Sequence, residues 1–258
     1  MDDLQAEYFL KARQQNKTQQ PFQFESKTPA SLAEAYAIQH HNYSNIGQSK
    51  GWKLGGTTSL TQAMFDTNAT YYGPIYQASI YESKNPIELP DWMNNPRGEA
   101  EVCFELSDKV KGLSDTTMDE IDISEFIVNI MPSIELPWSV FPLPAAGLNV
   151  LIADQCGTGA LVFGDRLPYS STHFPSLSGE VMISSTSGLL TEGSIEDILA
   201  GPLTALADFL RLAQQHQLQI KSGDFVATGG CTPCIELPLN RKITVDMTIL
   251  GEFSFILN

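Results

Sequence analysis

Hydrophobic positions in the first part of the chain recur with a helical period. Residues 1–16 have the spacing of an amphipathic helix, and a second helix follows and ends near residue 45. Its start has two possible readings, since either Thr28 caps it with Pro29 in the first turn, or Ser31 and Glu34 form a capping box. The pattern therefore predicts a small helical N-terminal lobe.

From about residue 75 the chain changes to short runs rich in β-branched and aromatic residues, separated by Pro, Gly, Asn and Asp, which is typical of short strands. The expected strands are Ile80-Tyr81, Glu101 to Leu106, Val150 to Ala153, Leu161 to Phe163, Val181 to Ser184, Phe225 to Thr228 and Ile243 to Ile249. A long amphipathic helix, expected over about 202–217, interrupts them.

Many short strands with few helices predict an α+β fold, with a mixed β-roll or sandwich and a small helical N-terminal lobe. We expect one structural unit, in which residues 1–75 form the lobe and residues 76–258 form the β-rich core. The length of 258 residues and the hydrophobic content of 42% are sufficient for a substantial core.

The charge balance limits the partners. There are 15 basic and 30 acidic residues, which give a net charge of −15 and argue against nucleic acid or an anionic membrane surface as a partner. The acidic first residues lack the features of a signal peptide, and no apolar run is long enough to span a membrane. We expect a cytoplasmic protein.

Glu99 and Glu101 provide the first candidate chemistry, because they lie two residues apart in a strand-like run. Side chains at such positions point to the same face, roughly 6.5–7 Å apart along the strand, and can reach one cation. An isolated pair of this kind is more often a solvated edge. Here, however, a third acid, Glu135, lies in an apolar segment where an unpaired charge is expensive to bury. Together the three carboxylates suggest a metal site.

Cysteine and histidine give weaker signals. Cys231 and Cys234 have the spacing of a redox or zinc pair, yet Cys103 and Cys156 are isolated and no histidine lies close to the pair in sequence. We expect a loop with incidental thiols. The glycine-rich segments do not match a phosphate-binding loop, so a nucleotide cofactor is not expected.

Seven segments, spread over nearly the whole chain, resemble one family in order and spacing. They are Ala35-Tyr36-Ala37-Ile38-Gln39, Lys53-Leu54-Gly55-Gly56-Thr57, Gly98-Glu99-Ala100-Glu101-Val102, Ile134-Glu135, Ile152-Ala153-Asp154, Gly201-Pro202-Leu203 and Gly223-Asp224-Phe225-Val226-Ala227-Thr228-Gly229. The family is the fumarylacetoacetate hydrolase superfamily, in its branch of 2-keto-4-pentenoate hydratases and 4-oxalocrotonate decarboxylases.

The resemblance implies a divalent cation, usually Mg²⁺ with Mn²⁺ or another ion as alternatives, held by Glu99, Glu101 and Glu135. Three carboxylates leave positions of an octahedral ion open for water and for a 2-oxo acid or dienoate substrate, whose enolate charge the metal stabilises. The family is often homo-oligomeric. The resemblance implies catalytic roles for Lys53 and Tyr71. The residues implied for substrate binding are Gly55, Thr57, Thr58, Asp154, Gln155, Thr228 and Gly229.

Lys53 corresponds to the family lysine that points into the cleft. Near a metal and in a desolvated pocket its charged form would be disfavoured, which suits a proton donor or acceptor, or it holds an anionic oxygen of the substrate.

The chain also departs from the family pattern. Tyr71 stands where the hydratases carry an aspartate, and a phenol with a pKa near 10 is a poor base at neutral pH. Val140 replaces an arginine that follows a serine, and Gln155 replaces an asparagine. The loop that begins at Gly230 also differs.

These residues favour a metal-dependent lyase, with a hydratase of 2-hydroxy-2,4-dienoates as the first expectation. A decarboxylase of 2-oxo-3-enedioates is the alternative and tolerates the missing aspartate better. A binding-only descendant that has lost its chemistry also stays open. Hydrolytic carbon–carbon cleavage is less favoured, because no histidine–acid pair lies near the expected site.

Overall fold

The structure is a computed structural model, and it describes residues 3–83, 86–115 and 122–258. The helices are α1 (Asp3–Gln15), α2 (Pro21–Phe24), α3 (Leu32–Ile46), α4 (Ser59–Phe65), α5 (Leu148–Ala153) and α6 (Pro202–Gln215). The strands are β1 (Ser49–Gly55), β2 (Tyr71–Tyr76), β3 (Ile80–Glu82), β4 (Arg97–Leu106), β5 (Ile127–Leu136), β6 (Ala160–Phe163), β7 (Leu167–Pro168), β8 (Glu180–Ser185), β9 (Gly188–Ser194), β10 (Phe225–Gly230), β11 (Ile235–Glu236), β12 (Lys242–Asp246) and β13 (Glu252–Ile256). This confirms the expected α+β class.

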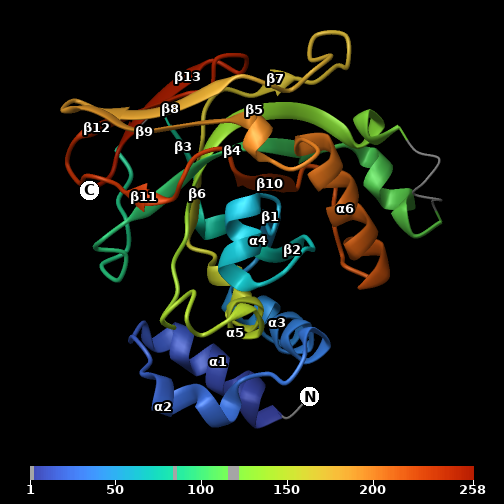
Figure 1. The fold of residues 1–258 in the computed structure, drawn as a ribbon. Helices are drawn as coiled ribbons and strands as arrows, with labels where there is room; N and C mark the ends of the chain where they lie inside the picture. Colours follow the sequence, from blue (N-terminus) through green and yellow to red (C-terminus); the bar gives the residue numbers. More distant parts are fainter. Residues whose placement is uncertain (1–2, 84–85, 116–121) are drawn as a thin grey trace.

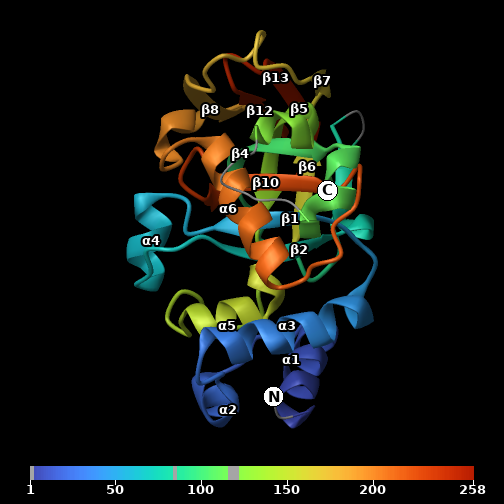
Figure 2. The same cartoon turned by 90° about the vertical axis from the view of Figure 1, so that its right-hand side faces the viewer.

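Two sheets make up the β-rich part (Figures 1 and 2). The larger is a curled, nine-stranded mixed sheet in the order β2-β1-β10-β4-β5-β6-β3, with β11 beside β4 and β7 beside β5. The smaller sheet has the order β13-β12-β8-β9. Strand β10 is parallel to β1 and antiparallel to β4. It therefore brings a segment from late in the chain between two early strands.

The central strands β4 and β5 are buried on both faces. On β4, Val102, Phe104 and Leu106 belong to the main core, whereas Cys103 packs with Met131 of β5 in a separate inner cluster. Even- and odd-numbered side chains of β4 thus pack on opposite faces, and the odd-numbered face lies against the inner cluster. Glu99 and Glu101 lie on that same face, so they face the interior.

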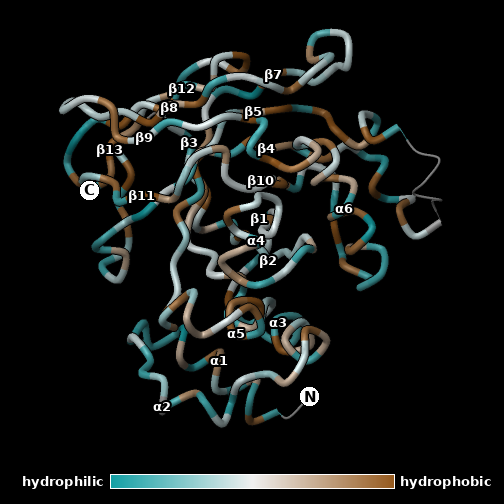
Figure 3. Tube along the Cα trace, viewed as in Figure 1, coloured by the Kyte–Doolittle hydropathy of each residue, from teal (hydrophilic) through white to brown (hydrophobic). Residues whose placement is uncertain are grey.

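The N-terminal helices pack against one another at one end of the molecule (Figure 2). Of the two possible starts for the second helix, the structure selects Ser31, whose hydroxyl accepts a hydrogen bond from the Glu34 amide at 3.2 Å. Figure 3 shows both hydrophobic and hydrophilic residues along α6, as expected of a helix packed on a sheet. No helix in the described ranges is long and apolar enough to cross a membrane.

The structure corrects the expectation for residues 150–153, which form the end of helix α5 and not a strand. All four residues are buried, and a short run buried on every side has no periodicity to distinguish a strand from a helix. Strand β12 also ends at Asp246, short of the expected Ile249.

Residues 49–76 contribute β1 and β2 to the large sheet as well as helix α4, none of which the sequence pattern indicated. The helical segment in front of them ends at Ile46. The division of the chain at residues 75 and 76 stays a prediction.

Candidate active site

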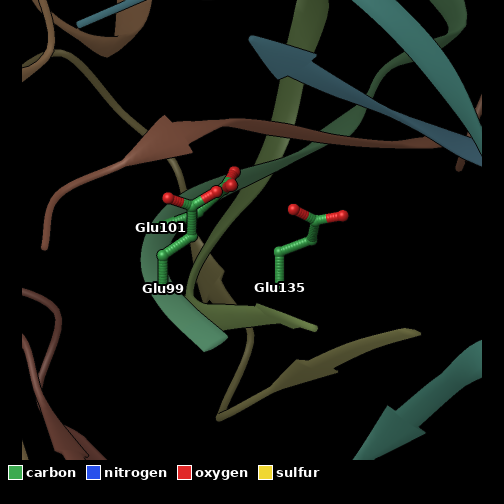
Figure 4. Close-up of side chains that lie close together, drawn as sticks. All are labelled: Glu99, Glu101 and Glu135. Atoms are coloured by element: carbon green, nitrogen blue, oxygen red, sulfur yellow. The ribbon is translucent and has the colours of Figure 1, made fainter. Parts of the chain in front are cut away.

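Three glutamates from two strands come together on the concave side of the large sheet (Figure 4). Glu99 and Glu101 lie on β4, and Glu99 is the register partner of Glu135 on the antiparallel strand β5. One carboxylate oxygen from each lies within 4.8 Å of one from each of the others. This spacing is what a single shared cation requires.

The three carboxylates are poorly compensated by the protein itself. Glu101 and Glu135 are buried, with exposures of 0% and 1%, and Glu101 Oε1 and Glu135 Oε1 have no hydrogen-bond partner among the described residues. Burial, together with the charge of Glu135, raises the pKa of Glu99 to about 7. Burial also raises the pKa of Glu101 and of Glu135. Such a cluster is expensive unless a cation joins it.

The geometry fits a divalent metal ion. All three side chains offer hard oxygen donors, and unpartnered buried carboxylate oxygens face one another within coordination range of a common centre. Mg²⁺, Mn²⁺ and Ca²⁺ are the ions that prefer such ligands. Glu99, Glu101 and Glu135 are therefore the residues that could hold the ion.

Lys53 on β1 contributes the nearest cation, with its Nζ 3.3 Å from Glu135 Oε2. Burial favours the neutral amine, but the surrounding carboxylates, of which Glu135 acts most strongly, outweigh this and raise the pKa. The expectation that the charged form is disfavoured applies to a site with a bound cation and stays a prediction. Lys53 is an ammonium group that points into the acidic cluster.

Tyr71 lies on β2, the strand next to β1, which carries Lys53. The position of the Tyr71 ring depends on a glycine of β1. Gly55 is the register partner of Tyr71 on the neighbouring strand, and a Cβ atom at Gly55 would lie 2.2 Å from the Tyr71 ring. Burial raises the pKa of the Tyr71 phenol, so the group is neutral and can donate a hydrogen bond. Gly55 therefore serves to admit the ring.

The end of β10 forms the next part of the site. An irregularity in the pairing of β10 with β4 lets the Gly229 amide donate a hydrogen bond of 2.8 Å to Glu101 Oε2. Gly229 has a φ of +102°, and a Cβ there would collide with Thr57 Oγ1. A Cβ at Gly230 would likewise lie 2.5 Å from Glu99 Oε2. Glycine is therefore required at position 229, and at position 230 a side chain would displace the Glu99 carboxylate.

These groups open into a cavity of about 500 Å³. Among the residues expected from the sequence, those that line it are Lys53, Gly55, Thr57, Tyr71, Glu99 and Gly229. Glu101 and Glu135 lie behind Glu99 and Lys53, in contact with them. A titratable cluster at the base of a cavity of this size is the usual arrangement of an active site.

Four residues expected to bind substrate do not line the cavity. The Thr58 hydroxyl caps helix α4 by accepting a hydrogen bond from the Thr61 amide, and the Thr228 hydroxyl donates to the Val102 carbonyl at 2.9 Å. Gln155 accepts a hydrogen bond from the Tyr76 hydroxyl at 3.0 Å. The structure therefore places these side chains in contacts that support the site from behind.

The fourth residue, Asp154, is 1% exposed and pairs with Arg13 of helix α1 at 3.2 Å. Ser139, which does line the cavity, donates a hydrogen bond of 2.6 Å to the other Asp154 oxygen. Burial raises the pKa of Asp154, and Arg13 acts in the opposite direction. Asp154 thus joins the helical lobe to the cavity wall.

Three ionisable residues of the cavity wall were not expected from the sequence. Arg97 precedes Glu99 by two positions on the same strand, which was a readable signal for a shared face. Cys156 and Cys234 also line the cavity, and burial raises the pKa of each thiol to about 12. Cys231 is buried and not part of the lining.

No family model matches the chain, but proteins similar in sequence and in structure were found. It is 23% identical to a 2-hydroxypent-2,4-dienoate hydratase of Pseudomonas putida over 157 residues, which are 61% of this chain and 69% of the relative. It is 21% identical to a 2-oxo-hept-4-ene-1,7-dioate hydratase of Escherichia coli over 245 residues, 86% of this chain and 85% of the relative.

Solved structures are similar in fold over most of this chain. The 4-oxalocrotonate decarboxylase of Pseudomonas putida G7, complexed with magnesium and adipate, superposes with a TM-score of 0.82 at 18% identity and covers 99% of this chain and 96% of its own. A fumarylpyruvate hydrolase of Pseudomonas aeruginosa, in complex with Mn²⁺ and pyruvate, has a TM-score of 0.59 at 10% identity and covers 82% of this chain and 89% of its own.

The resemblance read from the sequence is therefore confirmed by the hydratase relatives and by a superposition over nearly the whole chain. The chain has the fold of the fumarylacetoacetate hydrolase superfamily, and in sequence it is similar to two hydratases.

Proposed function

We propose that this protein is a divalent-metal-dependent hydro-lyase that adds water to a 2-hydroxy-2,4-dienoate. The observation that carries the proposal is the cluster of Glu99, Glu101 and Glu135 beside Lys53, at the base of a cavity. The sequence similarity to two hydratases supports the reaction class. A bound divalent cation would act as a Lewis acid toward the carboxylate and the 2-oxygen of the substrate.

The residues of the chain suit this reaction in three ways. The carboxylates around Lys53 favour its ammonium form, which can hold the negative charge that develops on the 2-oxygen when the enol loses its proton. Tyr71 presents a neutral hydroxyl as a hydrogen-bond donor. The buried glutamates Glu101 and Glu135 lie behind the cavity lining, away from solvent, where electrostatic interactions are strong.

In the balanced reaction, a proton is added at C5 of the dienoate to give the conjugated 2-oxo-3-enoate. Water then adds its oxygen to C4 and a proton to C3, and the product is a 4-hydroxy-2-oxo acid. In both steps an enolate carries negative charge on the 2-oxygen, so one set of cationic groups can stabilise both.

Decarboxylation of a 2-oxo-3-enedioate is the second candidate. It needs the same stabilisation of enolate charge but no activated water, which suits a site with Tyr71 in place of an acid. The similarity in fold to a 4-oxalocrotonate decarboxylase, with a TM-score of 0.82, supports it. Both candidates are lyase reactions of 2-oxo acids.

The test is a magnesium-dependent ultraviolet assay of the purified protein with 2-hydroxypenta-2,4-dienoate and with 2-oxo-3-hexenedioate, followed by NMR of the products. A 4-hydroxy-2-oxo acid establishes the hydratase, and release of carbon dioxide establishes the decarboxylase. No metal-dependent loss of either substrate contradicts both and favours the binding-only descendant. Glu135→Gln serves as the inactive control, and Glu105→Gln on β4 as the matched active one.

We further propose that the protein is a cytoplasmic homo-oligomer, as the sequence analysis expects. Light scattering after gel filtration measures the assembly state directly. A monomer across the working concentration range would contradict this part of the proposal.

A further inference from the structure

Helix α4 has an apolar face that the protein does not cover. None of its residues is buried, and Leu60 and Met64 are 57% and 46% exposed. Both of these residues, together with Phe65, line the cavity that holds Lys53 and Glu99. The face is therefore turned toward the candidate active site, where Phe65 packs edge-on against Tyr71 whereas Leu60 and Met64 stay exposed.

A second apolar wall lines the same cavity. It comes from the segment between β5 and α5 and from α5 itself, and includes Phe141, Leu143 and Leu151. Phe141 and Leu151 are only 4% and 6% exposed, so this wall is anchored in the core. Figure 2 shows α4 at the side of the molecule, above the loop that leads into α5. The outer part of the cavity thus has apolar groups on both sides.

Both cations of the cavity wall already have a carboxylate partner. Lys53 pairs with Glu135 at 3.3 Å. Arg97, at the outer end of β4, lies 3.8 Å from Glu236 and donates a hydrogen bond of 2.5 Å to the Cys234 carbonyl. A second carboxylate on a substrate would therefore lose its hydration among apolar side chains unless it reached Arg97, whose side chain is 52% exposed and lies 3.8 Å from the exposed Glu236.

We propose that the outer part of this cavity binds an apolar tail, so that the preferred substrate is a 2-oxo or 2-hydroxydienoic monocarboxylic acid with an alkyl or aryl substituent at its far end. The inference rests on the proposed function for the position of the acid group, and it adds the chemical class of the rest of the molecule. Leu60 and Met64 are specificity-determining residues, because a tail that they cover removes apolar surface from water.

Binding of saturated 2-oxo acids tests this inference without requiring turnover. The protein with Mg²⁺ is titrated calorimetrically with 2-oxopentanoate, 2-oxooctanoate and 2-oxohexanedioate. Three added methylene groups, only partly buried, should lower the Kd of 2-oxooctanoate about tenfold relative to 2-oxopentanoate. The diacid should bind no more tightly than 2-oxopentanoate.

Two variants with equally exposed leucines provide the control. Leu60→Gln should remove about two-thirds of the tenfold gain in affinity of 2-oxooctanoate over 2-oxopentanoate, and it should leave the Kd of 2-oxopentanoate unchanged. Leu189→Gln on β9 should change the Kd of neither acid. Leu189 is 58% exposed, close to the 57% of Leu60, and does not line the cavity. Glutamine is a good helix former, so α4 is retained.

Tighter binding of the diacid, equal binding of the two monoacids, or no binding of any of the three would overturn the inference. If the diacid binds best and Arg97→Gln removes that advantage, Arg97 binds the second carboxylate of the ligand. Graded binding in a protein that turns over no dienoate would leave the inference standing and would contradict the proposed function. Turnover of a dienoate without graded binding would support the proposed function and would overturn this inference.

Discussion

Glu99 and Glu135 lie directly opposite each other on the antiparallel strands β4 and β5, although 36 residues separate them in the sequence. Glu101, two positions further along β4, faces the same side, so cross-strand register and strand alternation together assemble the three carboxylates. The sheet therefore supplies all three ligands of the candidate metal site without any contribution from a loop.

Replacing Glu135 by glutamine should abolish tight metal binding with the fold retained. The variant keeps the size of the side chain but removes one anionic ligand, and we expect the affinity for Mg²⁺ or Mn²⁺ to fall about 100-fold or more. Calorimetric titration measures the affinity, and circular dichroism checks the fold. Glu105→Gln is the matched control, because Glu105 lies on the same strand and bonds instead to Asn129 and Arg166. Unchanged affinity in Glu135→Gln would refute the ligand assignment.

Metal binding should stabilise the protein against heat. At a free concentration of 100 times Kd, a ligand that binds only the folded state contributes about 2.7 kcal/mol, which for a chain of this size raises Tm by roughly 5–10 °C. Scanning calorimetry with EDTA and with Mg²⁺ measures the shift. In Glu135→Gln the shift should vanish, and a shift of equal size in that variant would mean that the ion binds elsewhere.

Substitution of Lys53 by methionine should separate metal binding from turnover. Removal of the ammonium group beside Glu135 takes away a positive charge that competes with the ion, so metal affinity should rise. Turnover should fall by about 10²–10⁴-fold, because the group that holds the developing negative charge is lost. Titration and kinetics on one preparation measure both quantities. Weaker metal binding in Lys53→Met would contradict this role.

The pair of Arg13 and Asp154 should be structural. Arg13 also donates hydrogen bonds to the Asp154 and Thr158 carbonyl groups. Arg13→Met leaves a buried carboxylate unpaired and should cost about 3–5 kcal/mol of the free energy of unfolding. Urea denaturation measures the loss. The exposed pair of Lys11 and Glu7 lies on the same helix, and Lys11→Met should cost at most about 1 kcal/mol. An equally small loss in Arg13→Met would contradict the assignment.

Acid should weaken the contact between α3, β2 and the end of α6. Tyr72 Oη lies 2.8 Å from His40 Nε2 and 2.6 Å from His216 Nδ1. Burial, and then the neighbouring His216, lowers the pKa of His40 from 6.5 to about 4. Because the folded state binds the proton less readily, this contribution to stability is complete above pH 6.5 and is lost as the pH falls toward 4.

Urea denaturation at about pH 7 and about pH 5 measures this effect. The His40→Gln variant should lose less stability than the parent protein over the same interval, because it lacks the titrating ring. The carboxylates of the metal site titrate in both proteins. The difference between the two proteins in how their free energy of unfolding changes with pH therefore isolates His40. Equal slopes would show that His40 does not contribute.

The local sequence was sufficient for elements whose pattern is strong. Helices α1, α3 and α6 follow from amphipathic spacing and from Ser31 and Pro202 at their starts, and most strands follow from β-rich runs between turn residues. It failed for residues 150–153, where uniform burial removes the periodicity that distinguishes a helix from a strand. It also gave no sign of β1 and β2.

The roles of individual polar residues depended on tertiary contacts. Asp154 ends a family-like segment and Gln155 departs from the family pattern, yet both side chains bond to residues outside the cavity lining, Arg13 and Tyr76. Arg97 carried a readable signal, since it shares a strand face with Glu99. No local pattern indicated the two apolar walls, because α4 and the segment before α5 meet only in space.

By itself, the sequence determined that the chain is acidic and α+β, and that it carries two glutamates on one strand face and a third in an apolar segment. Only the tertiary structure decided that β4 and β5 pair so that Glu135 completes the cluster, that Lys53 points into it and that apolar walls flank the cavity. The physical reason is that side-chain alternation is a local property of one strand, whereas register, burial and cavity shape arise from contacts between segments far apart in the chain.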